Sequence, residues 1–138
     1  METMRFSSLV PMVAHTATED TNLGGHYIPN GTAIFANLYD IHHSPNIWGD
    51  PENFRPERFL ENDGSCSGKH EYLIPFAVGK RVCLGESLAR NELFLFLTSV
   101  FQSFEVTWDQ SGPKPGLDGV DGTVVGPKPH KLVFSYRR

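Results

Sequence analysis

The sequence predicts an α+β fold, made of helices with small β-sheets. Residues 86–101 have the apolar content of one long helix. Several short stretches, among them 32–38 and 131–136, have the residue types of strands. The 13 glycines and 10 prolines are spread along the 138 residues, which predicts turns and irregular backbone between these elements.

The elements at the start of the chain are short. Residues 1–5 are expected to form the last turn of a helix, followed by an apolar stretch interrupted by Pro11. Residues 23–28 and 32–38 are predicted as two strands. The turn at 29–31 is expected to join them, because its Asn-Gly pair tolerates a positive φ.

The middle of the chain is predicted to be a long ordered meander over residues 44–72, anchored to a core by Trp48, Phe54 and Phe59. A loop at 75–85 leads into the helix at 86–101. That helix is apolar on almost every side, which is typical of a helix buried in a large protein. Because the rest of the chain offers few helices to cover it, we expect residues 1–138 to be one incomplete part of a larger domain.

The end of the chain is predicted to hold strands at 104–108 and 131–136, with a short hairpin near 117–125 in the Gly- and Pro-rich tail.

Composition excludes several classes of protein. Hydrophobic residues make up 39% and the net charge is −4, so the chain is neither a disordered tail nor a typical nucleic-acid-binding protein. No apolar run reaches the ~18 residues of a membrane span, and we find no signal peptide or other targeting segment.

The two cysteines, Cys66 and Cys83, are too few for a disulfide framework, although a single bridge between them stays open. Cys66 lies in a polar loop. Cys83 follows Lys80 and Arg81 and precedes the predicted helix, and both the cations and the helix N-terminus favour a thiolate there. The histidines do not have the spacing of a zinc finger.

The loop around Cys83 has five informative positions: Phe76, Gly79, Arg81, Cys83 and Gly85. Glycine at 79 permits a tight turn close to a flat ligand, and glycine at 85 permits close helix packing. Arginine can pair with an anionic group of the same ligand, and the phenylalanine can shield the sulfur from water. A single thiolate beside an arginine and an aromatic ring suits an iron porphyrin with propionates better than zinc.

These five positions resemble the haem-binding loop Phe-x-x-Gly-x-Arg-x-Cys-x-Gly of the cytochrome P450 superfamily. Three further blocks agree in order. Glu2 to Arg5 resembles the Glu-x-x-Arg of the K helix, Pro56 to Phe59 resembles the PERF segment, and residues 85–101 resemble the L helix of the animal microsomal branch. The resemblance implies the C-terminal part of a mainly α fold with small β-sheets: end of K helix, β-hairpins, meander, Cys-ligand loop, L helix and C-terminal strands.

The resemblance also implies roles for single residues. Cys83 would be the axial ligand of the haem iron, where the alternative is an inert buried cysteine. Arg81 would bind one haem propionate and His15 the other, unless His15 is an ordinary strand-edge histidine. Phe76, Gly79 and Gly85 would complete the haem site. A structural network would join Glu2, Arg5 and Arg58.

Further expectations concern the substrate and partners. The implied substrate pocket for a lipophilic molecule, which an ordinary core would also explain, comprises Leu9, Val10, Met12, Val13, Thr123, Val124 and Val125. Lys80 and Arg90 would dock an NADPH-dependent flavoprotein reductase, or are merely solvated. The implied function is monooxygenation at the cytosolic face of the endoplasmic reticulum membrane. The family's distal helix, with its acid-alcohol pair, and its N-terminal anchor have no counterpart here. A P450-type isomerase or dehydratase, and a non-catalytic truncated product, stay as alternatives.

Overall fold

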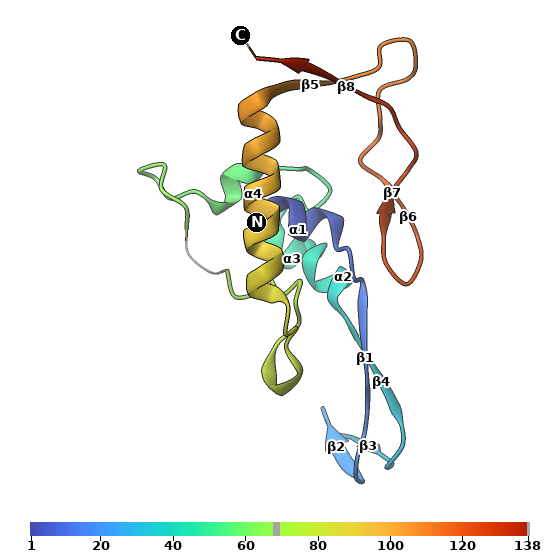
Figure 1. Ribbon diagram of the computed structural model, residues 1–138. Helices are drawn as coiled ribbons and strands as arrows, with labels where there is room; N and C mark the ends of the chain where they lie inside the picture. The colour runs from blue at the N-terminus through green and yellow to red at the C-terminus, as the bar shows by residue number, and fades with distance from the viewer. Residues whose placement is uncertain (68–69, 138) are drawn as a thin grey trace.

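The structure is a computed structural model that describes residues 1–67 and 70–137; residues 68–69, within the predicted meander, and 138 lie outside the described residues. Figure 1 shows the long helix α4 with a β-ladder at its C-terminal end, and a hairpin projecting away from the short helices. The helices are α1 (Glu2–Ser7), α2 (Leu38–His42), α3 (Pro45–Trp48), η1 (Pro56–Phe59), η2 (Gly79–Arg81) and α4 (Glu86–Ser103). The strands are β1 (Met12–Thr16), β2 (Thr21–Leu23), β3 (His26–Ile28), β4 (Ala33–Asn37), β5 (Phe104–Trp108), β6 (Gly119–Val120), β7 (Gly126–Pro127) and β8 (Leu132–Tyr136).

The strands form antiparallel two-stranded ladders within the described part of the chain: β1 with β4, β2 with β3, β5 with β8, and β6 with β7. The predicted strands at 104–108 and 131–136 are present and pair with each other, from Phe104 opposite Tyr136 to Trp108 opposite Leu132. The predicted hairpin near 117–125 is also present, and its ladder joins Gly119–Val120 to Gly126–Pro127.

The prediction of one strand over 23–28, paired through the turn at 29–31 with 32–38, was wrong. Gly24 and Gly25 both have positive φ, 58° and 87°, and they reverse the chain so that β2 pairs with β3. Two successive left-handed residues are what a tight two-residue hairpin requires. The turn at 29–31 does exist, with Gly31 at φ 82°, but it leads into β4, whose partner is β1.

The core is small and lies under the meander. Trp48, Phe59 and Leu73 form its buried apolar cluster, with Met1 and Ile47 against it. Trp48 and Phe59 therefore anchor the meander as predicted. Phe54 does not, because its side chain is 42% exposed and only meets the edge of the Phe6 ring.

Helix α4 covers the predicted helix and extends it to Ser103. None of its residues is buried, and large apolar side chains such as Phe94 and Phe96 are more than 60% exposed. Across the described residues we find no helix with both the length and the apolar character needed to cross a membrane.

Candidate functional site

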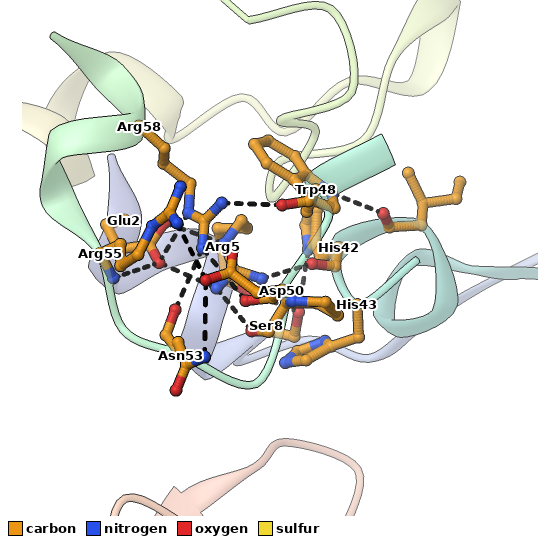
Figure 2. Close-up of polar contacts among 12 residues, drawn as sticks. Glu2, Arg5, Ser8, His42, His43, Trp48, Asp50, Asn53, Arg55 and Arg58 are labelled. Carbon is orange, nitrogen blue, oxygen red and sulfur yellow. Dashed lines mark hydrogen bonds and ion pairs between the residues drawn. The ribbon is translucent and has the colours of Figure 1, made fainter. Parts of the chain in front are cut away.

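A buried ionic cluster joins the N-terminal helix to the meander (Figure 2). The Glu2 carboxylate accepts hydrogen bonds from Arg5 Nε and Nη2, both at 2.9 Å, and from Arg58 Nε at 3.2 Å. Glu2 and Arg5 are 3% and 0% exposed. The structure thus brings together the three residues that the sequence grouped, although Arg58 is 53 residues further along the chain than Arg5.

The guanidinium groups of this cluster also hold the backbone around them. Arg5 donates to the carbonyls of His42 at 2.6 Å and Pro51 at 2.8 Å, and Arg58 donates to the carbonyl of Trp48 at 2.9 Å. Burial alone would raise the pKa of Glu2. The hydrogen bonds from Arg5 and from the Arg55 N–H, with the charges of Arg5 and Arg58, outweigh it and lower that pKa below its ordinary value.

His42 is a buried polar residue, 1% exposed, whose role the sequence did not predict. Its imidazole lies between the Ser8 hydroxyl, at 2.9 Å from Nδ1, and the Ile74 N–H, at 3.1 Å from Nε2. One signal could have drawn attention to it. His42 stands four residues after Leu38 on α2, and residues at i and i+4 share a helix face, here the buried one.

The loop that precedes α4 is closed by its own backbone. The Cys83 N–H donates to the Phe76 carbonyl at 3.0 Å, and the Val82 N–H donates to the Gly79 carbonyl at 3.2 Å. The chain reverses between them through two residues of positive φ, Ala77 at 61° and Gly79 at 81°. Glycine is the residue that adopts this conformation without steric cost, so its presence at 79 has a local reason.

Cys83 lies just before the N-terminus of α4, and its side chain is exposed. Both cysteines are unpaired, which excludes the single bridge left open above. A Cβ built on Gly85 would lie 3.8 Å from Cys83 Sγ, in ordinary van der Waals contact, so residue 85 adjoins the sulfur. Lys80 and Arg81 are exposed, and within residues 1–67 and 70–137 neither forms an ion pair.

Phe76 and Arg90 lie together beside the loop. The Arg90 guanidinium carbon is 5.2 Å from the centre of the Phe76 ring, and Arg90 Nε pairs with the Glu86 carboxylate at 2.9 Å. Arg90 therefore already has a counter-charge on its own helix, which leaves Lys80 as the more available cation. A hollow of about 290 Å³ lies between this part of the loop and α4, but Cys83 is not among its lining residues.

The two predicted pocket stretches meet although more than a hundred residues separate them. The Val125 N–H donates to the Leu9 carbonyl at 2.8 Å. Their apolar side chains are largely uncovered, with Leu9 at 56%, Met12 at 53% and Val124 at 54% exposed. His15 is exposed on β1 opposite Ile34. Across the described residues, no group of three or more His, Cys, Asp or Glu side chains is arranged to hold a metal ion.

Comparisons with known proteins agree with this arrangement. The family model described as Cytochrome P450 matches residues 1–134. The chain is 44% identical to Farnesoate epoxidase of Bombyx mori over 139 residues, covering 100% of this chain and 28% of the relative. It is 44% identical to human Cytochrome P450 2U1 over 138 residues, covering 99% of this chain and 25% of the relative.

A solved structure gives the same result in three dimensions. A zebra fish cytochrome P450 with abiraterone superimposes with a TM-score of 0.87 at 40% identity, over 99% of this chain and 31% of that one. The chain therefore belongs to the cytochrome P450 family and has the α+β fold of its C-terminal part. It spans about a quarter of the length of the curated relatives it matches.

Proposed function

We propose that residues 1–138 form the haem-ligand part of a cytochrome P450 monooxygenase, with Cys83 as the axial ligand. The observation that carries this proposal is the exposed, unpaired Cys83 side chain at the start of α4, on a loop closed by the hydrogen bond from its N–H to the Phe76 carbonyl. Family membership supports a haem-thiolate oxidoreductase in general.

The chemistry of the donor set fits haem. One soft sulfur donor, without further His, Cys or carboxylate ligands around it in the described residues, leaves the other positions of an iron to a porphyrin. Gly85 adjoins the sulfur without a side chain of its own, and a Cβ there would stand 3.8 Å from Sγ, in ordinary van der Waals contact. Arg81 is exposed and so able to pair with a propionate.

A bound haem with a thiolate ligand supplies dioxygen chemistry, because the thiolate favours cleavage of the O–O bond. The residues of this chain hold that ligand in place. Residue 83 lies just before the N-terminus of α4 and two residues after the exposed Arg81. Gly79 at φ 81° supplies the chain reversal that brings residue 83 back to residue 76.

The exposed surface supports the view that these residues belong to a larger domain. The chain exposes 10651 Å². A folded monomer of 15.4 kDa is expected to expose about 7,200 Å². The excess of roughly 3,500 Å² includes the apolar side chains of α4, and it is as large as the interface that an obligate partner buries.

The remaining parts of the proposal follow from the family. A lipophilic substrate would lie against the exposed apolar residues of 9–13 and 123–125, and electrons would come from NADPH through a flavoprotein reductase near Lys80. Two relatives are named for lipophilic molecules: Farnesoate epoxidase and, from Squalus acanthias, Steroid 17-alpha-hydroxylase/17,20 lyase. We place the protein at the cytosolic face of the endoplasmic reticulum membrane by the same resemblance.

The full-length protein that carries residues 1–138 provides the test. Reduced and exposed to carbon monoxide, it is expected to give the red-shifted Soret band of thiolate-ligated haem. Cys83→Ala should abolish that band, whereas Cys66→Ser should retain it, since Cys66 lies in a different loop. A band that survives Cys83→Ala, or that is missing from the unmodified protein, would contradict the proposal.

A second candidate is favoured by the uncovered apolar face of α4: the 138-residue chain by itself is a non-catalytic product. Haem titration of the purified chain separates the two, because tight binding at one haem per chain would argue against a non-catalytic role. An isomerase or dehydratase that uses haem without a reductase would differ in having no NADPH-dependent turnover in the full-length protein.

A further inference from the structure

The buried imidazole of His42 connects the end of α1 with the segment that precedes the Cys83 loop. On one side it meets Ser8, which ends α1 in a left-handed conformation at φ 35°. On the other side it meets the backbone N–H of Ile74, two residues before Phe76. Its own carbonyl accepts from Arg5 at 2.6 Å. The His42 residue is thus held by both its main chain and its side chain.

The partners of the imidazole determine its protonation. A backbone N–H only donates, so Nε2 must accept from Ile74 and carries no proton. Nδ1 then carries the single proton and donates to Ser8 Oγ, which in turn donates to the Arg5 carbonyl at 2.9 Å. Burial, with the nearby charges of His43 and Arg5, lowers the pKa of His42 to about 4, in agreement with a neutral ring.

Backbone hydrogen bonds continue from Ile74 to the ligand residue. The Ile74 carbonyl accepts from the Ala77 N–H at 3.0 Å, and this contact closes the first turn of the loop. The Phe76 carbonyl accepts from the Cys83 N–H, also at 3.0 Å. Ile74 therefore lies at the start of the loop, two residues before the Phe76 carbonyl that accepts from the Cys83 N–H.

We propose that His42 is a positioning residue for the axial ligand: its unprotonated Nε2 fixes the Ile74 N–H and thereby seats the loop that presents Cys83. This inference rests on the proposed function, because it concerns a thiolate held toward iron. It adds a specific atom, Nε2 of a neutral imidazole, to the parts of the fold that hold that thiolate.

Two substitutions of His42 test its hydrogen bonds to Ser8 and to Ile74 separately. In His42→Gln the amide oxygen can occupy the place of Nε2 and still accept from Ile74. In His42→Asn the shorter side chain can reach Ser8 but not Ile74. The readout is the ratio of thiolate-ligated to displaced-ligand haem in the carbon monoxide spectrum of the reduced full-length protein, measured well below the thermal midpoint of each variant. Phe59→Leu, which loosens the core cluster and removes no hydrogen bond of His42, is the control for destabilisation alone.

We expect His42→Asn to lower that ratio by about tenfold, a factor typical of a lost buried hydrogen bond, while His42→Gln and Phe59→Leu keep the wild-type ratio. Equal ratios in His42→Asn and wild type would overturn the proposal, and so would an equal loss in His42→Asn and Phe59→Leu. If the His42→Asn protein does not fold, the His42→Gln protein provides the test. A folded His42→Gln protein with the wild-type ratio supports the proposal. A reduced ratio in folded His42→Gln, or failure of both His42 variants to fold, overturns the proposal. A wild-type protein without the thiolate band would instead refute the proposed function.

Discussion

The backbone N–H of Val125 donates to the carbonyl of Leu9 at 2.8 Å. This single contact brings the turn between β6 and β7 against the segment that follows α1, although the two are far apart in sequence. Both segments carry exposed aliphatic side chains next to the contact. If a lipophilic substrate is bound there, the Leu9–Val125 hydrogen bond sets the distance between the two apolar stretches that would enclose it.

Replacing the donor tests this arrangement. Val125→Pro has no backbone N–H, so the carbonyl of Leu9 loses its partner and the turn is released at a cost of about 1 kcal/mol. In the full-length protein we expect a higher KM for the substrate and an unchanged thiolate-haem band. Asp121→Ala, in the same turn but outside the proposed pocket residues, serves as the control. A Val125→Pro protein with wild-type KM would show that this contact does not shape the pocket.

The ionic cluster should be sensitive to the loss of its carboxylate. Glu2→Gln leaves the Arg5 guanidinium buried without its counter-charge, while Arg58 keeps Asp50 at 3.2 Å; the loss is expected to cost about 3–5 kcal/mol of stability. Glu57→Gln removes an equal charge from an exposed position of η1 and should change stability by less than about 0.5 kcal/mol. Thermal unfolding of the full-length variants measures the difference. Similar midpoints for the two would contradict a central role for Glu2.

The buried His42 predicts a specific loss of stability in mild acid. Its pKa is about 4 when folded and 6.5 when unfolded, so the unfolded state takes up the proton first as the pH falls. Its contribution is complete above pH 6.5, declines between pH 6.5 and about 4, and amounts to about 3 kcal/mol. The thermal midpoint of the full-length protein should fall over this range. His42→Gln, which has no titratable group, should lack this component, and an identical slope in the variant would rule out His42 as its source.

Glu2 acts in a lower pH range. Its pKa is lowered in the folded state, so its contribution is present above its ordinary pKa of 4.5 and is lost as the pH falls through the lower folded value. The decline due to His42 therefore begins at a higher pH than the decline due to Glu2. Comparing His42→Gln with Glu2→Gln across the pH range should resolve the two components.

The chain reversal at Gly79 provides another test. Gly79→Ala places a Cβ on a residue at φ 81°, which costs about 1 kcal/mol or more even though the space around it is open. We expect a smaller fraction of the full-length protein to retain haem. Gly126→Ala is the matched control, because residue 126 has open space but no positive φ. Equal haem retention in the two variants would mean that the loop does not depend on a left-handed residue at 79.

The sequence predicted the features that depend on local pattern. The helix at 86–101 and the strands at 104–108 and 131–136 are in place because their periodicity and residue types agree with the final fold. The sequence did not predict the hairpin of β2 and β3, because the two glycines at 24–25 lie inside the stretch expected to be one strand. Phe54 was misplaced because aromatic spacing alone does not tell which rings reach the core.

The candidate site likewise contains residues that the sequence pattern could indicate and residues that it could not. The loop residues from Phe76 to Gly85 could be selected from their types and spacing, since they lie within ten residues of one another. The role of His42 could not, because it depends on Ser8 and Ile74, which are 34 and 32 residues away in sequence. The Leu9–Val125 hydrogen bond is similarly a property of the folded chain. Sequence pattern alone did not indicate which backbone groups would meet.

The ladders have a further consequence for handling the protein. In the described part of the chain each sheet has two strands, so each strand keeps one edge whose N–H and C=O groups are not paired within the sheet. Such edges are templates for additional strands, and two-stranded ribbons are marginally stable by themselves. At β5 and β8 the open edges carry exposed Phe134 and Tyr136. Prepared without its neighbouring segments, the chain should self-associate through strand pairing as its concentration rises.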